Sequence, residues 1–131
     1  MLLDEKFPLV KAVLIGTSKN DFKEISIDIS SRSSQITQYL GGTATFIGQW
    51  VDHDIVIMKC REPIIETELN INFLSKPFHI EKTRGPILLI KMDESSNPQD
   101  LTLEEVLDLK LIHRGQSRYD LRGGRNPSRS I

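Results

Sequence analysis

The stretch LGGTATFIGQWVDHDIVIMKC, from Leu40 to Cys60, gives the clearest indication of the fold. Its two arms are rich in β-branched and aromatic residues, and the polar turn at 51–54 separates them. We therefore expect residues 43–60 to form a β-hairpin. Period-2 alternation would place Phe46, Gly48 and Trp50 on one strand face, with Gly48 marking a bulge or a close backbone approach.

The paired glycines Gly41 and Gly42 precede this hairpin and suggest two opposite interpretations. A phosphate-binding loop needs a strand, then glycines, then a helix whose N-terminus faces the phosphate. Here a helix comes first and a strand follows, so the dipole at this point has the wrong sign for an anion. We predict that Gly41 ends a helix in the left-handed conformation.

Strand patterns dominate on both sides of this stretch. We expect a buried strand at 6–16 paired in a hairpin with an alternating strand at 22–30, another strand near 67–73 between long loops, and a strand at 87–92. The sequence therefore predicts a single small α+β domain at 1–113, with a mostly antiparallel sheet of about five strands, two helices and a basic C-terminal tail at 114–131.

Two helices are expected. The first spans 31–40, with Ser33 or Ser34 as its N-cap. The second spans 102–113, because Thr102 and Glu105 have the spacing of a capping box, while Leu101 and Val106 have that of a hydrophobic staple. Gly115 would close this second helix.

Composition limits the class of protein. The chain has 131 residues, of which 38% are apolar and 27% charged, as in ordinary globular domains. Its apolar runs are too short to cross a membrane, and its N-terminus lacks the basic start of a signal peptide. A single cysteine, Cys60, excludes an internal disulfide. We expect an intracellular protein of the cytoplasm or nucleus.

Charge is distributed unevenly along the chain, although the net charge is only −1. The tail at 114–131 holds five arginines and one acid, and the preceding residues hold 12 basic and 17 acidic side chains. Such a tail either keeps the protein soluble or binds acidic proteins or nucleic-acid phosphates. Its candidate partner-binding residues are Arg114, Arg118, Arg122, Arg125 and Arg129.

Catalytic and metal-binding signals are weak. The triplet Asp52-His53-Asp54 offers metal-ligand types, but adjacent turn residues rarely point at one centre, and no cofactor or metal motif accompanies it. His79 and Glu81, near Arg84, form the one candidate acid–base pair, and neither hydrolase nor kinase motifs occur. We assign no catalytic residue, and an enzyme is the less favoured class.

Three further residues are candidates for contact with a partner. Trp50, if exposed at a hairpin tip, would anchor a partner as aromatic residues commonly do, although we favour a place in the core. His53 lies in the adjacent turn, and His79 lies in a predicted loop, where functional residues concentrate.

The residues between about 39 and 107 resemble an uncharacterised family of small proteins from large DNA viruses of algae and related microbial eukaryotes. The resembling residues are Gly41-Gly42, Phe46, Gly48-Gln49-Trp50, Asp54, Val56, Gly85-Pro86, Met92-Asp93 and Pro98-Gln99-Asp100-Leu101-Thr102. The resemblance implies no activity and transfers no catalytic residue. It implies a viral or algal context, a virion-associated place and membership of a larger assembly.

The leading hypothesis is a non-enzymatic interaction or structural protein whose Arg-rich tail docks on an acidic partner protein. The alternative is a nucleic-acid-binding accessory protein, whose affinity would fall steeply with salt. A second alternative is a small hydrolase or transferase that uses His79. Oligomers are compatible with all three hypotheses.

Overall fold

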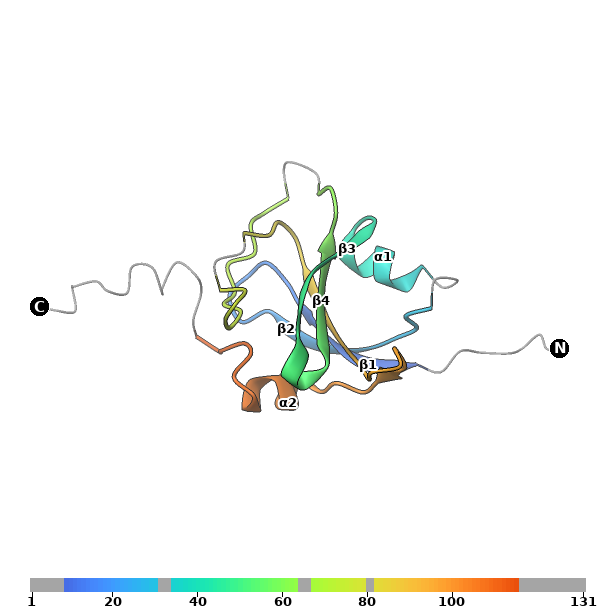
Figure 1. Cartoon of the computed structure of the whole chain (residues 1–131). Helices are drawn as coiled ribbons and strands as arrows, with labels where there is room; N and C mark the ends of the chain where they lie inside the picture. The colour runs from blue at the N-terminus through green and yellow to red at the C-terminus, as the bar shows by residue number, and fades with distance from the viewer. Residues whose placement is uncertain (1–8, 31–33, 64–66, 80–81, 116–131) are drawn as a thin grey trace, which may run out of the picture.

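A central antiparallel sheet organises the molecule. The computed structural model describes residues 9–30, 34–63, 67–79 and 82–115. The sheet has the strand order β2-β1-β5-β4-β3, with β6 paired to β5 (Figure 1). The strands are β1 (Val10–Ile15), β2 (Phe22–Ile27), β3 (Ala44–Trp50), β4 (Ile55–Cys60), β5 (Ile87–Met92) and β6 (Pro98–Gln99). The predicted α+β class, with about five sheet strands and two helices, is confirmed.

Two hairpins flank the central strand β5. The strands β1 and β2 pair from Val10 with Ile27 to Ile15 with Phe22, as expected for the first hairpin. The strands β3 and β4 form the second hairpin, and β5 pairs with both β1 and β4. The residues Ile87 to Ile90 are all buried, because a central strand with two covered faces excludes water from both.

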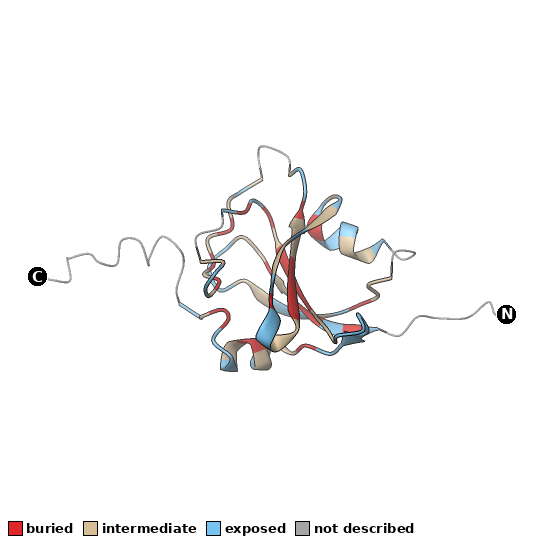
Figure 2. Cartoon of the chain, in the orientation of Figure 1, coloured by how far each residue is buried: buried red, intermediate tan, exposed pale blue. Residues whose placement is uncertain are grey.

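Each face of the sheet carries its own hydrophobic core. On one face, side chains such as Ile55, Ile57 and Leu89 pack with the segment 101–112 and with Leu74. On the other face, Val56, Leu88 and Ile90 pack on the side of helix α1 (Gln35–Leu40). The buried residues follow the central strands in Figure 2. No helix in the described ranges is long and apolar enough to span a membrane.

The short strand β6 was not among the predicted strands, because residues 93–99 are mostly polar and have no alternating pattern. It pairs with Lys91 and Met92 at the end of β5, where β1 no longer pairs with β5. The next residues hold β1 in place: the Leu101 amide donates to the Lys11 carbonyl at 2.9 Å, and the Lys11 amide donates to Asp100 at 2.9 Å. This strand therefore forms by pairing with β5 across a short loop, next to the bonds to β1, although its sequence has no strand pattern.

Helix α2 (Leu103–Asp108) begins as predicted but ends early. The Thr102 hydroxyl accepts a hydrogen bond from the Glu105 amide at 3.1 Å, which confirms the N-cap. Leu101 and Val106 are both fully buried, as the staple requires. The predicted end near 113 is wrong, because Lys110 adopts a φ of 61° and turns the chain five residues before Gly115.

Helix α1 ends at its predicted residue but begins without the predicted cap. Gly41 has a φ of 83°, and its amide donates to the Thr37 carbonyl, so the glycine closes the helix. Ser34 occupies the N-cap position with a φ of 62° and makes no side-chain capping bond. The alternative cap, Ser33, lies outside the described residues.

A β-bulge in β3 corrects the predicted face of Phe46. The register shifts between Phe46, which pairs with Met58, and Gly48, which pairs with Ile57. Because one extra residue reverses the alternation, Phe46 lies on the α1 face and is 62% exposed. Trp50 lies on the opposite face, buried as favoured.

The strand predicted near 67–73 is absent from the described residues of that segment, which contains isolated bridge positions at Leu69, paired with Arg84, and at Asn72. Buried amides organise the segment instead. Asn70 donates to the carbonyls of Ile15 and Gly85 at 3.1 and 3.0 Å. Asn72 donates to the carbonyls of Gly16 and Ser18, both at 2.8 Å. Side chains therefore satisfy backbone groups that a strand ladder would otherwise pair.

Candidate functional site

A basic hollow lies at the end of the sheet where the β3–β4 hairpin turns. The hollow has a volume of about 570 Å³. It is walled by the hairpin turn, by the loop 73–77 and by the segment 109–113. The side chains that give it its character are Trp50, Asp52, His53, Lys76, Lys110 and His113.

Backbone and ring contacts hold the walls of the basic hollow together. The Trp50 indole donates from Nε1 to the Lys76 carbonyl at 3.1 Å, and the Ser75 amide donates to the Leu111 carbonyl at 2.9 Å. Behind Trp50, the ring of Phe78 meets the indole edge-on at 5.6 Å between centroids. Trp50 is therefore a structural wall with 6% of its surface exposed, and it cannot be the exposed anchor of a partner.

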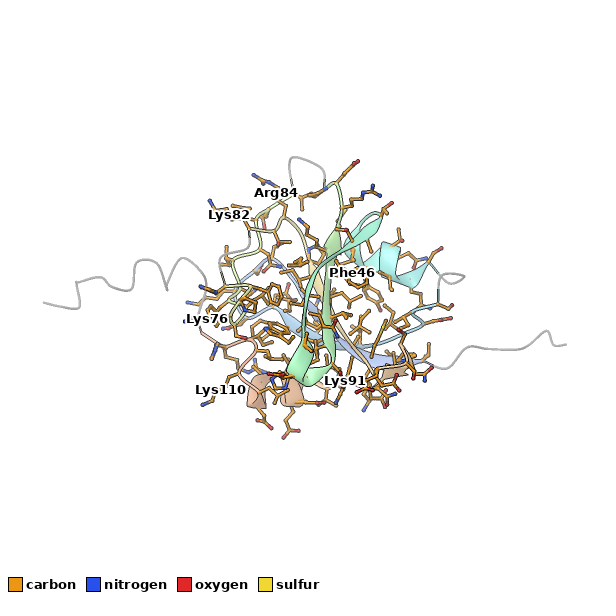
Figure 3. The ribbon with its side chains drawn as sticks, in the orientation of Figure 1. Phe46, Lys76, Lys82, Arg84, Lys91 and Lys110 are labelled. Atoms are coloured by element: carbon orange, nitrogen blue, oxygen red, sulfur yellow. The ribbon has the colours of Figure 1, made fainter. Side chains whose placement is uncertain are left out.

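The charge of the basic hollow is mainly positive. Lys76 and Lys110 are exposed and form no salt bridge with any described carboxylate, and Asp52 is the acid at the rim. His53 and His113 also line the hollow, and the ring of His113 contacts that of Phe73, with 5.0 Å between centroids and 51° between the ring planes. Figure 3 shows Lys76, Lys82, Arg84 and Lys110 along the same side of the molecule. That side offers several positive charges to an anionic surface.

The start of the tail adjoins this side. The Arg114 guanidinium lies over the Phe22 ring at 5.9 Å, and the Gly115 amide donates to the Asn20 side chain at 2.6 Å. These contacts tie the last described residues to the turn between β1 and β2. Arg118, Arg122, Arg125 and Arg129 lie outside the described residues.

His79 is separate from the basic hollow and does not line it. Its Nδ1 atom is buried and has no hydrogen-bond partner among the described residues. Glu81, its predicted acid–base partner, lies outside the described residues, so that pairing stays a prediction. No group of three or more histidine, cysteine or acidic side chains placed to hold a metal ion occurs in the part of the chain that the structure describes.

A second hollow, which we call the Phe46 groove, lies on the α1 face beside the hairpin. It has a volume of about 730 Å³. Its apolar members are Phe46, Val51, Val56 and Met92, and its acids are Asp54, Asp93 and Glu94. Sequence analysis missed this groove, because the bulge that turns Phe46 to this face depends on pairing with β4.

Comparison with known proteins places the chain in a family. Residues 13–109 match the model of a family of unknown function, DUF5880. The chain belongs to this family. No curated protein and no solved structure matches it. Membership confirms that the chain belongs to an uncharacterised family, and the matched residues cover the whole described sheet except the first residues of β1.

Proposed function

We propose that the protein is a non-enzymatic interaction module that docks an acidic partner protein on the side formed by the basic hollow and the Arg-rich tail. The observation that carries this proposal is the placement of Lys76 and Lys110, exposed and without described carboxylate partners, on the side of the molecule where the described chain ends. A folded basic surface therefore continues into a basic segment of the same chain.

Physical chemistry supports an extended contact of this kind. Exposed lysines attract a distant acidic surface and raise the rate of encounter, while arginines form two parallel hydrogen bonds to a carboxylate. The ordered start of the tail at Arg114 and Gly115 would reduce the entropy lost on binding. We propose that the protein lies inside the cell, as its single cysteine suggests, or in the virion as part of a larger viral assembly, as the family resemblance implies.

The test compares charge reversals in the full-length chain. Captured proteins from a source-cell extract are identified for the unaltered chain, for Arg118→Glu/Arg122→Glu/Arg125→Glu and for Lys110→Glu. Arg61→Glu, an exposed site that does not line the basic hollow, has the same charge change as Lys110→Glu and serves as its control. We expect the tail variant to lose the partner, Lys110→Glu to weaken its capture, and Arg61→Glu to leave it unchanged.

Nuclease treatment separates the two classes of anionic partner. Capture that survives nuclease supports the protein partner. Capture that nuclease removes, together with binding to a single-stranded homopolymer that falls steeply with salt, supports the nucleic-acid alternative and contradicts the proposal. Equal capture by all four chains would also contradict it, since neither the basic hollow nor the tail would then matter.

A further inference from the structure

The Phe46 groove combines an exposed apolar floor with an acidic rim. Phe46 is 62% exposed and Val51 is 71% exposed, and both line it. Exposed apolar surface rimmed by polar groups is typical of an interaction site. Helix α1 contacts β3 and β4, but Leu40 packs near Cys60, at the end of the hairpin farthest from its turn. The groove is thus the part of this face that α1 leaves open.

No lysine or arginine is among the described residues that line the groove, and the pleat of β5 explains why Lys91 is not. Lys91 and Met92 are neighbours and point to opposite faces. Met92 lines the groove, while the Lys91 ammonium donates to Glu105 at 2.8 Å on the α2 face. The three acids therefore have no lysine or arginine beside them among the described residues that line the groove.

The acidic rim is partly preorganised. Asp93 accepts the amides of Ser95 and Asn97, each at 2.9 Å, which closes the loop between β5 and β6. Asp54 is held in the hairpin turn at a φ of 60°, and its carbonyl accepts the Met92 amide at 2.9 Å. Asp54 and Asp93 thus come from two turns that are fixed to each other, so the acidic rim is built before any ligand arrives.

We propose that the Phe46 groove binds the C-terminal segment 116–131 of a second copy of this chain. This segment carries four arginines, one acid and the apolar side chains Tyr119 and Leu121. Its charge is opposite to that of the groove, and Tyr119 and Leu121 match the apolar floor. Tyrosine and arginine are the residues most often found at the energetic centre of interfaces. The inference rests on the proposed docking of the tail and names its acidic surface.

The tail and the groove are different surfaces of the chain, which gives association between copies a head-to-tail form. The Phe46 groove and the basic hollow adjoin at the hairpin, where Gln49 and Val51 line both, and the described chain ends on the side of Lys110. Donor and acceptor surfaces that differ in this way give head-to-tail contacts, which close into rings or extend as filaments. The N-terminal segment 1–8 is the other candidate occupant, but its two acids and one lysine repeat the sign of the groove.

The test uses full-length chains and two defective variants. Phe46→Ser alters the groove at an exposed side chain, and Arg118→Glu/Arg122→Glu/Arg125→Glu alters the tail. We expect the mass of the unaltered chain, measured by sedimentation velocity, to rise with concentration, and each variant to associate at least roughly tenfold more weakly. Tyr39→Ser, an exposed aromatic outside the groove, is the matched control and should associate as the unaltered chain does.

Mixing the two variants gives the decisive result. The intact tail of the Phe46→Ser chain should enter the intact groove of the tail variant, so the mixture should form a one-to-one dimer that does not grow further. An unaltered chain that stays monomeric at every concentration would overturn the inference. This holds both if the chain's own tail covers its groove and if residues 1–8 cover it. A mixture without dimer would also overturn it. Loss of an acidic partner in the capture experiment with no self-association would leave the proposed function standing and reject only this inference.

Discussion

At the scale of single residues, two buried asparagines hydrogen-bond to backbone carbonyls, a role that the sequence pattern does not predict. Asn70 and Asn72 are each 1% exposed, and the side-chain Oδ1 of Asn70 accepts from the Asn72 backbone amide at 3.1 Å. They stand in the apolar run ELNINFL, which reads as a strand. A buried amide side chain needs hydrogen-bond acceptors for its N–H groups. For Asn70 these acceptors are carbonyls at the end of β1 and in the turn before β5.

We predict that Asn70→Ala lowers the free energy of unfolding by about 2–4 kcal/mol. The change leaves the Ile15 and Gly85 carbonyls without their donor, and each buried unsatisfied group costs about 1–3 kcal/mol. Urea denaturation measures the loss. Asn97→Ala, at an exposed position, is the control and should change stability by less than about 0.5 kcal/mol. A similar small effect at Asn70 would show that the network is dispensable.

At the scale of elements, the bulge in β3 separates two roles along one strand. After the bulge, Trp50 faces the α2 side and forms a wall of the basic hollow. Before the bulge, Phe46 faces the groove on the other side of the sheet. Gly48 permits this arrangement, because a Cβ at that position would collide with the Phe78 ring. The sequence signalled a bulge or a close approach at Gly48, and both are present.

We predict that Gly48→Ala destabilises the protein by about 1–3 kcal/mol, the usual cost of overpacking a core. Phe78 must move from its edge-on contact with Trp50, which is the sole tryptophan. The indole fluorescence should therefore change together with the denaturation midpoint. Gln49→Ala, at the exposed neighbouring residue, should leave both unchanged. Normal fluorescence and stability in Gly48→Ala would mean that the bulge tolerates a side chain.

At the scale of the whole molecule, β5 joins the two hairpins. It is buried on both faces and paired on both edges, whereas β2 and β3 pair on one edge only within the described sheet. Opening β5 therefore requires separation of both hairpins and exposure of both cores. Outer strands can lose their pairing with less surface exposed.

We predict that amides of Leu88, Leu89 and Ile90 exchange with solvent most slowly, at the rate set by global unfolding. Amides of β2 should exchange faster, since local opening of this edge strand breaks one ladder. Native-state hydrogen exchange followed by NMR measures both, and mild urea serves as a check, because only globally exchanging amides respond strongly to it. Slower exchange in β2 than in β5 would contradict the central role of β5.

Patterns that depend on neighbours in the chain were readable from the sequence. Alternation predicted the two hairpins, the apolar run at 87–92 predicted a strand, and Thr102 with Glu105 predicted the start of α2. Gly41 predicted the end of α1. In each case the interacting groups lie within a few residues or along one strand, so local geometry suffices. His53 was singled out for its residue type and does line the basic hollow.

The remaining features depend on groups that are far apart in the chain. The face of Phe46 depends on the register with β4, and the loss of a strand at 67–73 depends on carbonyls of β1 and of the turn before β5. The early end of α2 is an exception, since the positive φ of the nearby Lys110 turns the chain there. The basic hollow and the Phe46 groove each join residues separated by dozens of positions. By itself the sequence determined the α+β class and the division of charge between body and tail. Tertiary structure alone decided which charges and apolar side chains meet, because burial and long-range pairing select faces that local patterns leave open.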